Sequence, residues 1–142
     1  MAKIYWLHGQ PGSGKSSVGK LLQMWLQTEK ANWRKTVFHI DEDNIKKLYM
    51  ENHLENIATI AKFLLSTNHD VVVSAVTPSN SFREAIKDTL KVTEIYCHTK
   101  NIAGKDKNAI ITTYEMPEKN FVDLDTTEDT ERTFDKLIKM LL

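Results

Sequence analysis

The sequence predicts an α/β protein, in which a central parallel five-stranded sheet lies between two layers of helices as a three-layer α/β/α sandwich. The main observation is that short apolar runs alternate along the chain with longer segments whose apolar residues recur at helical spacing. Such alternation is typical of βαβ units, whose strands pair in parallel. A length of 142 residues suits one domain, so we expect residues 1–142 to form a single domain.

Five short apolar segments are the expected strands. They cover residues 3–8, 36–40, 71–76, 92–98 and 121–124. The third is almost wholly apolar, which is typical of a central parallel strand covered by helices on both faces. Cys97, the only cysteine, falls in the fourth segment. We expect it to be a buried strand residue, because free cysteine usually behaves as a small apolar side chain.

Helical periodicity fills the intervals between these strands. The first helix is expected from about residue 14 to residue 30, with Val18, Leu22 and Leu26 on its apolar face. Further helices are expected at 45–50, at 54–67, from residue 79 or 81 to 90, and at the end of the chain. The pattern Thr126-x-x-Asp129 resembles a capping box and predicts that Thr126 caps the last helix.

The charge balance restricts the class of partner. Lysine and arginine number 19, as do aspartate and glutamate, so the formal net charge is zero. Nucleic-acid-binding proteins normally carry a basic excess, and we therefore do not expect a nucleic-acid partner. No apolar run approaches the roughly 20 residues of a membrane span, and the single cysteine fits a reducing compartment. These features predict a cytoplasmic protein with no membrane partner.

Residues 9–16 match the phosphate-binding pattern G-x-x-x-x-G-K-[ST] without a mismatch. In this pattern, backbone N–H groups and the following helix hold phosphates, the lysine reaches the β- and γ-phosphates, and the hydroxyl binds Mg²⁺. The preceding strand and following helix predict a P-loop NTPase fold that binds ATP and Mg²⁺. The predicted ATP site consists of Gly9, Gln10, Pro11, Gly12, Ser13, Gly14, Lys15, Ser16 and Ser17.

Three carboxylates, Asp41-Glu42-Asp43, follow the second predicted strand. Ligands of open parallel sheets bind at the carboxyl ends of the strands, so these side chains are expected near the γ-phosphate. The roles that such carboxylates can take there are organisation of Mg²⁺ and acceptance of the proton of an attacking hydroxyl, and Asp41 and Asp43 are the candidates. Asp43 as the cap of a following helix is the alternative. Glu42 is expected to point to solvent.

The histidines show no pattern of a metal site. His53, His69 and His98 lack the spacing of zinc ligands. For His8 and His39 we favour packing within the strands over contact with a ligand.

With these motifs in order, most of the chain resembles the adenylyl-sulfate kinase family. The resemblance rests on the phosphate loop and on seven segments: Ile4-Tyr5-Trp6-Leu7-His8-Gly9, Asp41-Glu42-Asp43-Asn44-Ile45-Lys46, Glu55-Asn56-Ile57, Thr77-Pro78-Ser79-Asn80-Ser81-Phe82-Arg83-Glu84, Glu94-Ile95-Tyr96, Tyr114-Glu115-Met116-Pro117 and Asp123-Leu124-Asp125-Thr126. Only the phosphate loop is diagnostic by itself.

The resemblance implies an enzyme that transfers the γ-phosphoryl group of ATP to the 3′-hydroxyl of adenylyl sulfate, a small-molecule substrate, giving 3′-phosphoadenylyl sulfate and ADP. It implies that Asp43 is the catalytic base or positioning carboxylate for that hydroxyl, and that Asp41 helps Ser16 with magnesium and also contacts the substrate. Lys15, which the phosphate-loop motif places at the β- and γ-phosphates, is expected to be catalytic as well. Members of the family are often dimers, so a homodimer is one expected assembly. The residues implied to line the substrate site are Asp41, Asp43, Lys46, His53, Asn56, Thr77 and Arg83.

The chain also departs from the family pattern. Glu42 replaces a glycine, Lys46 and Asn80 replace arginines, and His53 stands where another arginine would fall. Residues 99–113 are too short for the family's lid and are expected to form a reduced one, in which Lys100, Lys105 and Lys107 face either phosphate or solvent.

These departures leave two other functions open. One is a kinase for another small-molecule, nucleoside or polynucleotide hydroxyl, which the lost arginines favour. The other is a nucleotide-binding or nucleotide-hydrolysing switch without an acceptor. The absence of an Asn-Lys-x-Asp guanine-reading motif counts against a GTPase.

Overall fold

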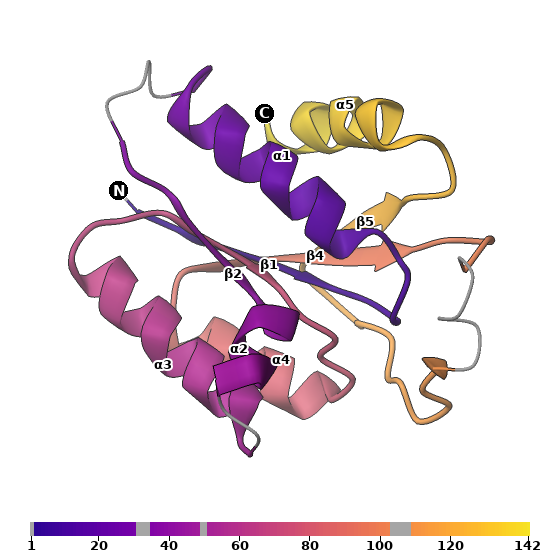
Figure 1. Ribbon diagram of the computed structural model, residues 1–142, viewed down its shortest axis with the longest axis horizontal. Helices are drawn as coiled ribbons and strands as arrows, with labels where there is room; N and C mark the ends of the chain where they lie inside the picture. The colour runs from indigo at the N-terminus through magenta and orange to yellow at the C-terminus, as the bar shows by residue number, and fades with distance from the viewer. Residues whose placement is uncertain (1, 31–34, 49–50, 103–108) are drawn as a thin grey trace.

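The computed structural model describes residues 2–30, 35–48, 51–102 and 109–142 (Figure 1). Its sheet consists of β1 (Ile4–His8), β2 (Phe38–Asp41), β3 (Val71–Ser74), β4 (Val92–His98) and β5 (Phe121–Asp125). The strand order is β2-β3-β1-β4-β5, and every neighbouring pair is parallel. The predicted five-stranded parallel sheet is therefore confirmed.

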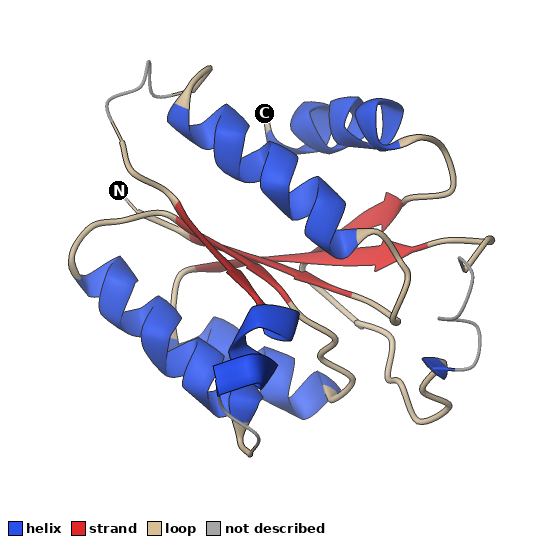
Figure 2. Cartoon of the chain, in the orientation of Figure 1, coloured by secondary structure: helices blue, strands red, loops and turns tan. Residues whose placement is uncertain are grey.

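Helices cover both faces of the sheet, as the α/β/α sandwich requires (Figure 2). On one face lie α1 (Lys15–Gln27) and α5 (Thr130–Leu141), which contact each other. On the other face lie α2 (Glu42–Leu48), α3 (His53–Ser66) and α4 (Asn80–Thr89). In the described part of the chain, no helix is long and apolar enough to cross a membrane.

The alternation of side chains along β1 divides the core into two halves. Tyr5 and Leu7 face α1 and α5, whereas Ile4 and Trp6 face α3 and α4. All four side chains are buried, as an internal parallel strand requires. Burial of an apolar side chain of this size contributes about 1.5–3 kcal/mol, so β1 anchors both layers and fixes the point from which the phosphate loop departs.

Several element ends differ from the sequence-based expectation. The first helix ends at Gln27 rather than residue 30, and Thr28 caps it by donating its hydroxyl to the Met24 carbonyl at 2.7 Å. β3 ends at Ser74, two residues early. The helix expected at 45–50 begins at Glu42, directly after β2. Buried Cys97 agrees with its predicted place in a strand.

The predicted cap of the last helix is wrong. α5 begins at Thr130, and the Asp129 side chain accepts a hydrogen bond from the Arg132 backbone N–H at 2.9 Å. Thr126 lies just beyond β5 and donates its hydroxyl to the Ser13 carbonyl at 2.6 Å. The hydroxyl of Thr126 therefore holds the phosphate loop, while a residue of the same capping type three positions later begins the helix.

Candidate active site

The phosphate loop joins β1 to α1 at the carboxyl edge of the sheet. Gly12 and Gly14 have φ angles of 81° and 83°, in the left-handed region that glycine adopts without a steric penalty. At Gly9, a Cβ atom would lie 2.2 Å from the Cys97 carbonyl oxygen, so any side chain there would collide with β4. These backbone demands explain why the loop needs glycine at all three positions.

The strand register brings the acidic segment beside this loop. Asp41 at the end of β2 pairs with Ser74 of β3, and Ser74 pairs with Leu7 of β1. The three residues form one row across the sheet, directly before the phosphate loop. The carboxylates that follow β2 therefore lie near the loop, as predicted.

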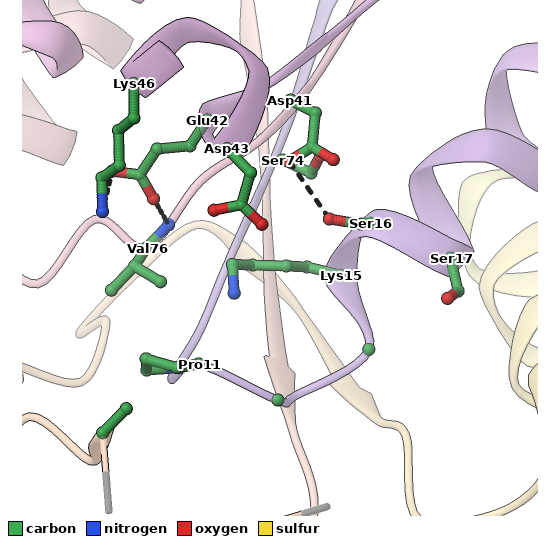
Figure 3. A pocket seen from close by; sticks show the side chains of 13 residues that line it. Pro11, Lys15, Ser16, Ser17, Asp41, Glu42, Asp43, Lys46, Ser74 and Val76 are labelled. Atoms are coloured by element: carbon green, nitrogen blue, oxygen red, sulfur yellow. Dashed lines mark hydrogen bonds and ion pairs between the residues drawn. The ribbon is translucent and has the colours of Figure 1, made fainter. Parts of the chain in front are cut away.

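Loop and acidic segment enclose a cavity of about 430 Å³ (Figure 3). Its lining residues are Pro11, Gly12, Gly14, Lys15, Ser16, Ser17, Asp41, Glu42, Asp43, Lys46, Ser74, Val76 and Ala109. Gly9, Gln10 and Ser13, which complete the predicted ATP site, are part of the loop but do not line the cavity. Lys105 and Lys107 of the predicted lid lie outside the described residues.

Lys15 brings a poorly hydrated positive charge into the cavity. Only 9% of the residue is exposed, and its ammonium donates to the Gln10 carbonyl at 3.2 Å. Burial lowers the pKa of Lys15, and the carboxylates of Glu42, Asp43 and Asp41 oppose that shift. A cation that has already lost much of its water interacts strongly with a phosphate placed beside it.

Ser16 and Asp41 bring two oxygen ligands together on the cavity wall. The Ser16 hydroxyl donates to Asp41 Oδ1 at 3.2 Å, which joins the first turn of α1 to the end of β2 (Figure 3). Behind them, His39 Nε2 lies 2.7 Å from Ser74 Oγ, which agrees with the predicted packing role of His39. Hydroxyl and carboxylate oxygens are ligands that Mg²⁺ accepts.

Asp43 points into the cavity from the first turn of α2, towards the Lys15 side chain (Figure 3). Because α2 begins at Glu42, Asp43 lies inside the helix. The alternative of Asp43 as a helix cap is therefore wrong. Its carboxylate is available to a molecule bound in the cavity.

The expectation that Glu42 points to solvent is wrong. Only 4% of the residue is exposed. Its Oε1 accepts the Val76 backbone N–H at 2.8 Å, and its Oε2 lies 2.6 Å from His53 Nε2 and 3.9 Å from the Lys46 ammonium. Lys46 is a local partner, four residues along α2. Val76 and His53 lie on other segments, and no local pattern in the sequence indicates these two contacts.

A second hollow of about 250 Å³ adjoins the first. Pro11, Glu42, Lys46 and Val76 line both hollows. The second is closed by His53, Leu54, Pro78 and Ile111. It extends the cavity beside the phosphate loop, and two of the predicted substrate residues, Lys46 and His53, lie on its wall.

The remaining predicted substrate residues line neither hollow. Thr77 is fully buried, where its hydroxyl accepts the Trp6 indole N–H and donates to the Ala75 carbonyl, each at 2.9 Å. Asn56 lies on α3, with its side-chain amide 3.5 Å from the Glu51 carbonyl.

Arg83 is buried in α4, away from both hollows. Its Nε atom lies 3.2 Å from Glu94 Oε2, and its other nitrogens donate to the Thr77 and Glu115 carbonyls. These contacts support a structural role for Arg83, because they occupy the side chain within the fold.

Two contacts near the loop were not predicted. His8 is fully buried, with Nε2 2.8 Å from Glu94 Oε2 and Nδ1 2.6 Å from the Tyr114 hydroxyl. Burial lowers the pKa of His8, and the hydrogen bond to Glu94 opposes that shift. The one available signal was Glu94, a charged residue within an apolar strand segment, because such a residue needs a buried partner.

Comparison with known proteins supplies the family. Residues 1–115 match the family model for adenylylsulphate kinase. The chain belongs to the adenylylsulphate kinase family. The resemblance inferred from the ordered motifs is confirmed.

Similar curated proteins include an adenylyl-sulfate kinase of Staphylococcus epidermidis, 24% identical over 169 residues, which cover 97% of this chain and 83% of that protein. The adenylyl-sulfate kinase of Buchnera aphidicola is 26% identical over 168 residues, which cover 97% of this chain and 78% of that protein.

Among solved structures, the APS kinase of Mycobacterium tuberculosis in complex with AMPPNP and APS superposes with a TM-score of 0.78. It is 20% identical, and the match covers 99% of this chain and 97% of that one. Kti12 of Chaetomium thermophilum in complex with ADP-AlF3 has a TM-score of 0.63 and 13% identity over 98% and 99% of the chains. Both show the fold alone, and the predicted P-loop NTPase fold is confirmed.

Proposed function

We propose that this chain transfers the γ-phosphoryl group of ATP to the 3′-hydroxyl of adenylyl sulfate, giving 3′-phosphoadenylyl sulfate and ADP. One observation carries the proposal. A single cavity holds the lysine of a phosphate loop on one side and a carboxylate, Asp43, on the other (Figure 3). Family membership supports adenylyl sulfate as the acceptor.

The two sides of the cavity have different roles in this reaction. The loop N–H groups and the Lys15 ammonium hold the β- and γ-phosphates of ATP. The acceptor oxygen forms a bond to the γ-phosphorus as the bond between that phosphorus and the β,γ-bridging oxygen breaks, and ADP leaves with the electron pair. Asp43 accepts the proton of the acceptor hydroxyl. Catalysis is then mainly positioning and charge stabilisation.

Ser16 and Asp41 are the residues that would hold Mg²⁺. The 3.2 Å contact between their oxygens brings a hydroxyl and a carboxylate together beside the loop. This donor set fits the ion, which is usually bound by one or two carboxylates together with substrate phosphates and water. When bound, Mg²⁺ neutralises charge on the phosphate oxygens.

The second hollow is the proposed acceptor site. It shares its wall with the phosphate cavity and presents Lys46 and His53 to an anionic substrate. Leu54, Val76, Pro78 and Ile111 provide an apolar surface suited to the flat face of a nucleoside.

A second acceptor class is favoured by one specific observation. Glu42 is a buried carboxylate on the wall of the hollow, where it engages both Lys46 and His53. An anionic acceptor has to share the Lys46 ammonium and the His53 imidazole with Glu42, whereas a neutral hydroxyl compound does not. A kinase for a neutral small-molecule hydroxyl is therefore the second candidate.

Product analysis with two variants tests the proposal. The protein is incubated with ATP, Mg²⁺ and adenylyl sulfate, with adenosine as a competing neutral acceptor, and the products are separated by chromatography. We expect 3′-phosphoadenylyl sulfate to form. Lys15→Ala should lose both ATP affinity and transfer, because it removes the phosphate contact. Asp43→Asn should lower kcat by about 10²–10⁴-fold with ATP affinity retained.

Each other result identifies a specific error. Phosphorylation of adenosine alone would select the neutral acceptor class. ADP release without any phosphorylated acceptor would favour a nucleotide-hydrolysing switch. Equal loss of ATP affinity in both variants would contradict the separate roles of Lys15 and Asp43.

A further inference from the structure

Glu42 is a buried carboxylate with partners on its own helix and on two other segments. It is the first residue of α2, and its Oε1 accepts the Val76 backbone N–H at 2.8 Å, just beyond β3 (Figure 3). Its Oε2 lies 2.6 Å from Nε2 of His53, the first residue of α3. One side chain thus joins the beginnings of two helices to the central part of the sheet.

These contacts are the ones that make burial of the charge tolerable. An ionised carboxylate buried without partners is strongly unfavourable. Here the Val76 backbone N–H donates to one carboxylate oxygen of Glu42. The other oxygen lies 2.6 Å from His53 Nε2 and 3.9 Å from the Lys46 ammonium. Loss of the carboxylate would leave the Val76 N–H without its acceptor. The cluster therefore favours one arrangement of the first turn of α2.

That turn carries Asp43. Side-chain contacts fix both preceding residues. Asp41 accepts a hydrogen bond from the Ser16 hydroxyl at 3.2 Å, and Glu42 contacts Val76 and His53. In the described residues α2 covers Glu42–Leu48 and contacts α3 and β2. Because the side-chain contacts of Asp41 and Glu42 hold the start of this helix, the position of the Asp43 carboxylate depends on them.

We propose that Glu42 is a positioning residue, which holds the first turn of α2 so that the Asp43 carboxylate faces the phosphate cavity. The inference rests on the proposed function, in which Asp43 receives the acceptor proton. A misplacement of about 1 Å in a reacting group costs about 100-fold in rate. A substitution that removes the contacts of Glu42 should therefore lower kcat far more than it changes the affinity for ATP.

Asp70 provides a matched control. It is also a buried carboxylate that accepts a backbone N–H, that of Lys3 at 2.8 Å, and it also faces a lysine, with the Lys35 ammonium at 3.4 Å. It precedes β3, at the amino edge of the sheet, away from the cavity. Substitution of Asp70 removes the same kind of contact without touching α2.

The test compares E42A, E42Q and D70A with the wild-type chain at a temperature where circular dichroism shows all four to be folded. With ATP, Mg²⁺ and adenylyl sulfate, E42A should lower kcat about 100-fold while KM for ATP changes less than about threefold. E42Q should recover most of kcat, since its amide oxygen still accepts the Val76 N–H. D70A should leave kcat unchanged. An equal loss in D70A, or no rescue by E42Q, would overturn the proposal.

Two further readouts separate this inference from the choice of acceptor. If the wild type releases ADP but does not phosphorylate adenylyl sulfate, the proposed acceptor is wrong, and the same order of variants is expected for ADP formation. A crystal structure of E42A requires no turnover. Displacement of the Asp43 carboxylate away from Lys15 supports the positioning role, and an unchanged carboxylate overturns it.

Discussion

His8 and Gln10 lie on either side of Gly9, and both side chains contact the segment around residues 111–114. The Gln10 amide donates to the Ile111 carbonyl and accepts the Ile111 N–H, each at 2.8 Å. His8 Nδ1 lies 2.6 Å from the Tyr114 hydroxyl. Residues 8 and 10 thereby fix the first turn of the phosphate loop through their side chains, against a segment about 100 residues later in the chain.

The buried imidazole of His8 predicts a pH dependence of stability. Burial lowers its pKa in the folded protein below the ordinary value of 6.5. Between those two pKa values the unfolded chain binds more protons than the folded one, so the free energy of unfolding decreases as the pH falls through this window. Urea unfolding at pH 7.5 and pH 5.5 should show the wild type less stable at the lower pH.

His8→Gln supplies the comparison for that experiment. Glutamine does not titrate, so the loss of stability between the two pH values should be smaller than in the wild type, even if the variant is less stable overall. The same pH dependence in both proteins would show that other groups cause it. The lowered pKa of Glu94 does not interfere, because its contribution is lost only below its ordinary value of 4.5.

At the scale of elements, the sequence predicted what local periodicity controls. Apolar runs identified all five strands, and helical spacing identified α1 and α3. Helix ends were less accurate, because they depend on which side chain finds a free backbone group. Thr126 and Asp129 are both good capping residues, and only the hydrogen bond from Thr126 to the phosphate loop shows that the Thr126 hydroxyl is already engaged.

In the candidate site too, local motifs were predicted and long-range contacts were not. Lys15, Ser16, Asp41 and Asp43 were predicted because short motifs specify them and strand register brings them together. His53 and Val76, two partners of Glu42, lie on other segments of the chain, and no motif in this sequence links them to it. Long-range pairing of buried charges was therefore the part of the site that sequence reasoning did not resolve.

The revised cap of α5 gives a prediction at this scale. Asp129→Ala removes the acceptor of the Arg132 N–H and should lower the free energy of unfolding by about 1 kcal/mol. Asp135→Ala, at an exposed position inside the same helix, should change it by less than about 0.5 kcal/mol. Chemical denaturation measures both, and equal effects would argue against Asp129 as the cap.

At the scale of the whole molecule, one buried polar network joins the helical layer to the sheet. Glu94 of β4 is 2.8 Å from His8 of β1, 3.2 Å from Arg83 and 2.6 Å from Lys87, both of α4. Arg83 continues the network to the Thr77 and Glu115 carbonyls. The network thereby connects the strand before the phosphate loop to the segment after residue 109.

Arg83→Met tests whether this arginine serves the fold or the substrate. Methionine keeps the apolar stem but removes the charge and its hydrogen bonds, and loss of one partner of a buried ion pair costs about 3 kcal/mol or more. The structural role therefore predicts a large decrease in the free energy of unfolding, with KM for the acceptor nearly unchanged while the variant is folded. A role in substrate binding predicts a raised KM for the acceptor, with the free energy of unfolding nearly unchanged. Arg132→Met, at an exposed pair with Asp129, is the control and should change stability by less than about 1 kcal/mol.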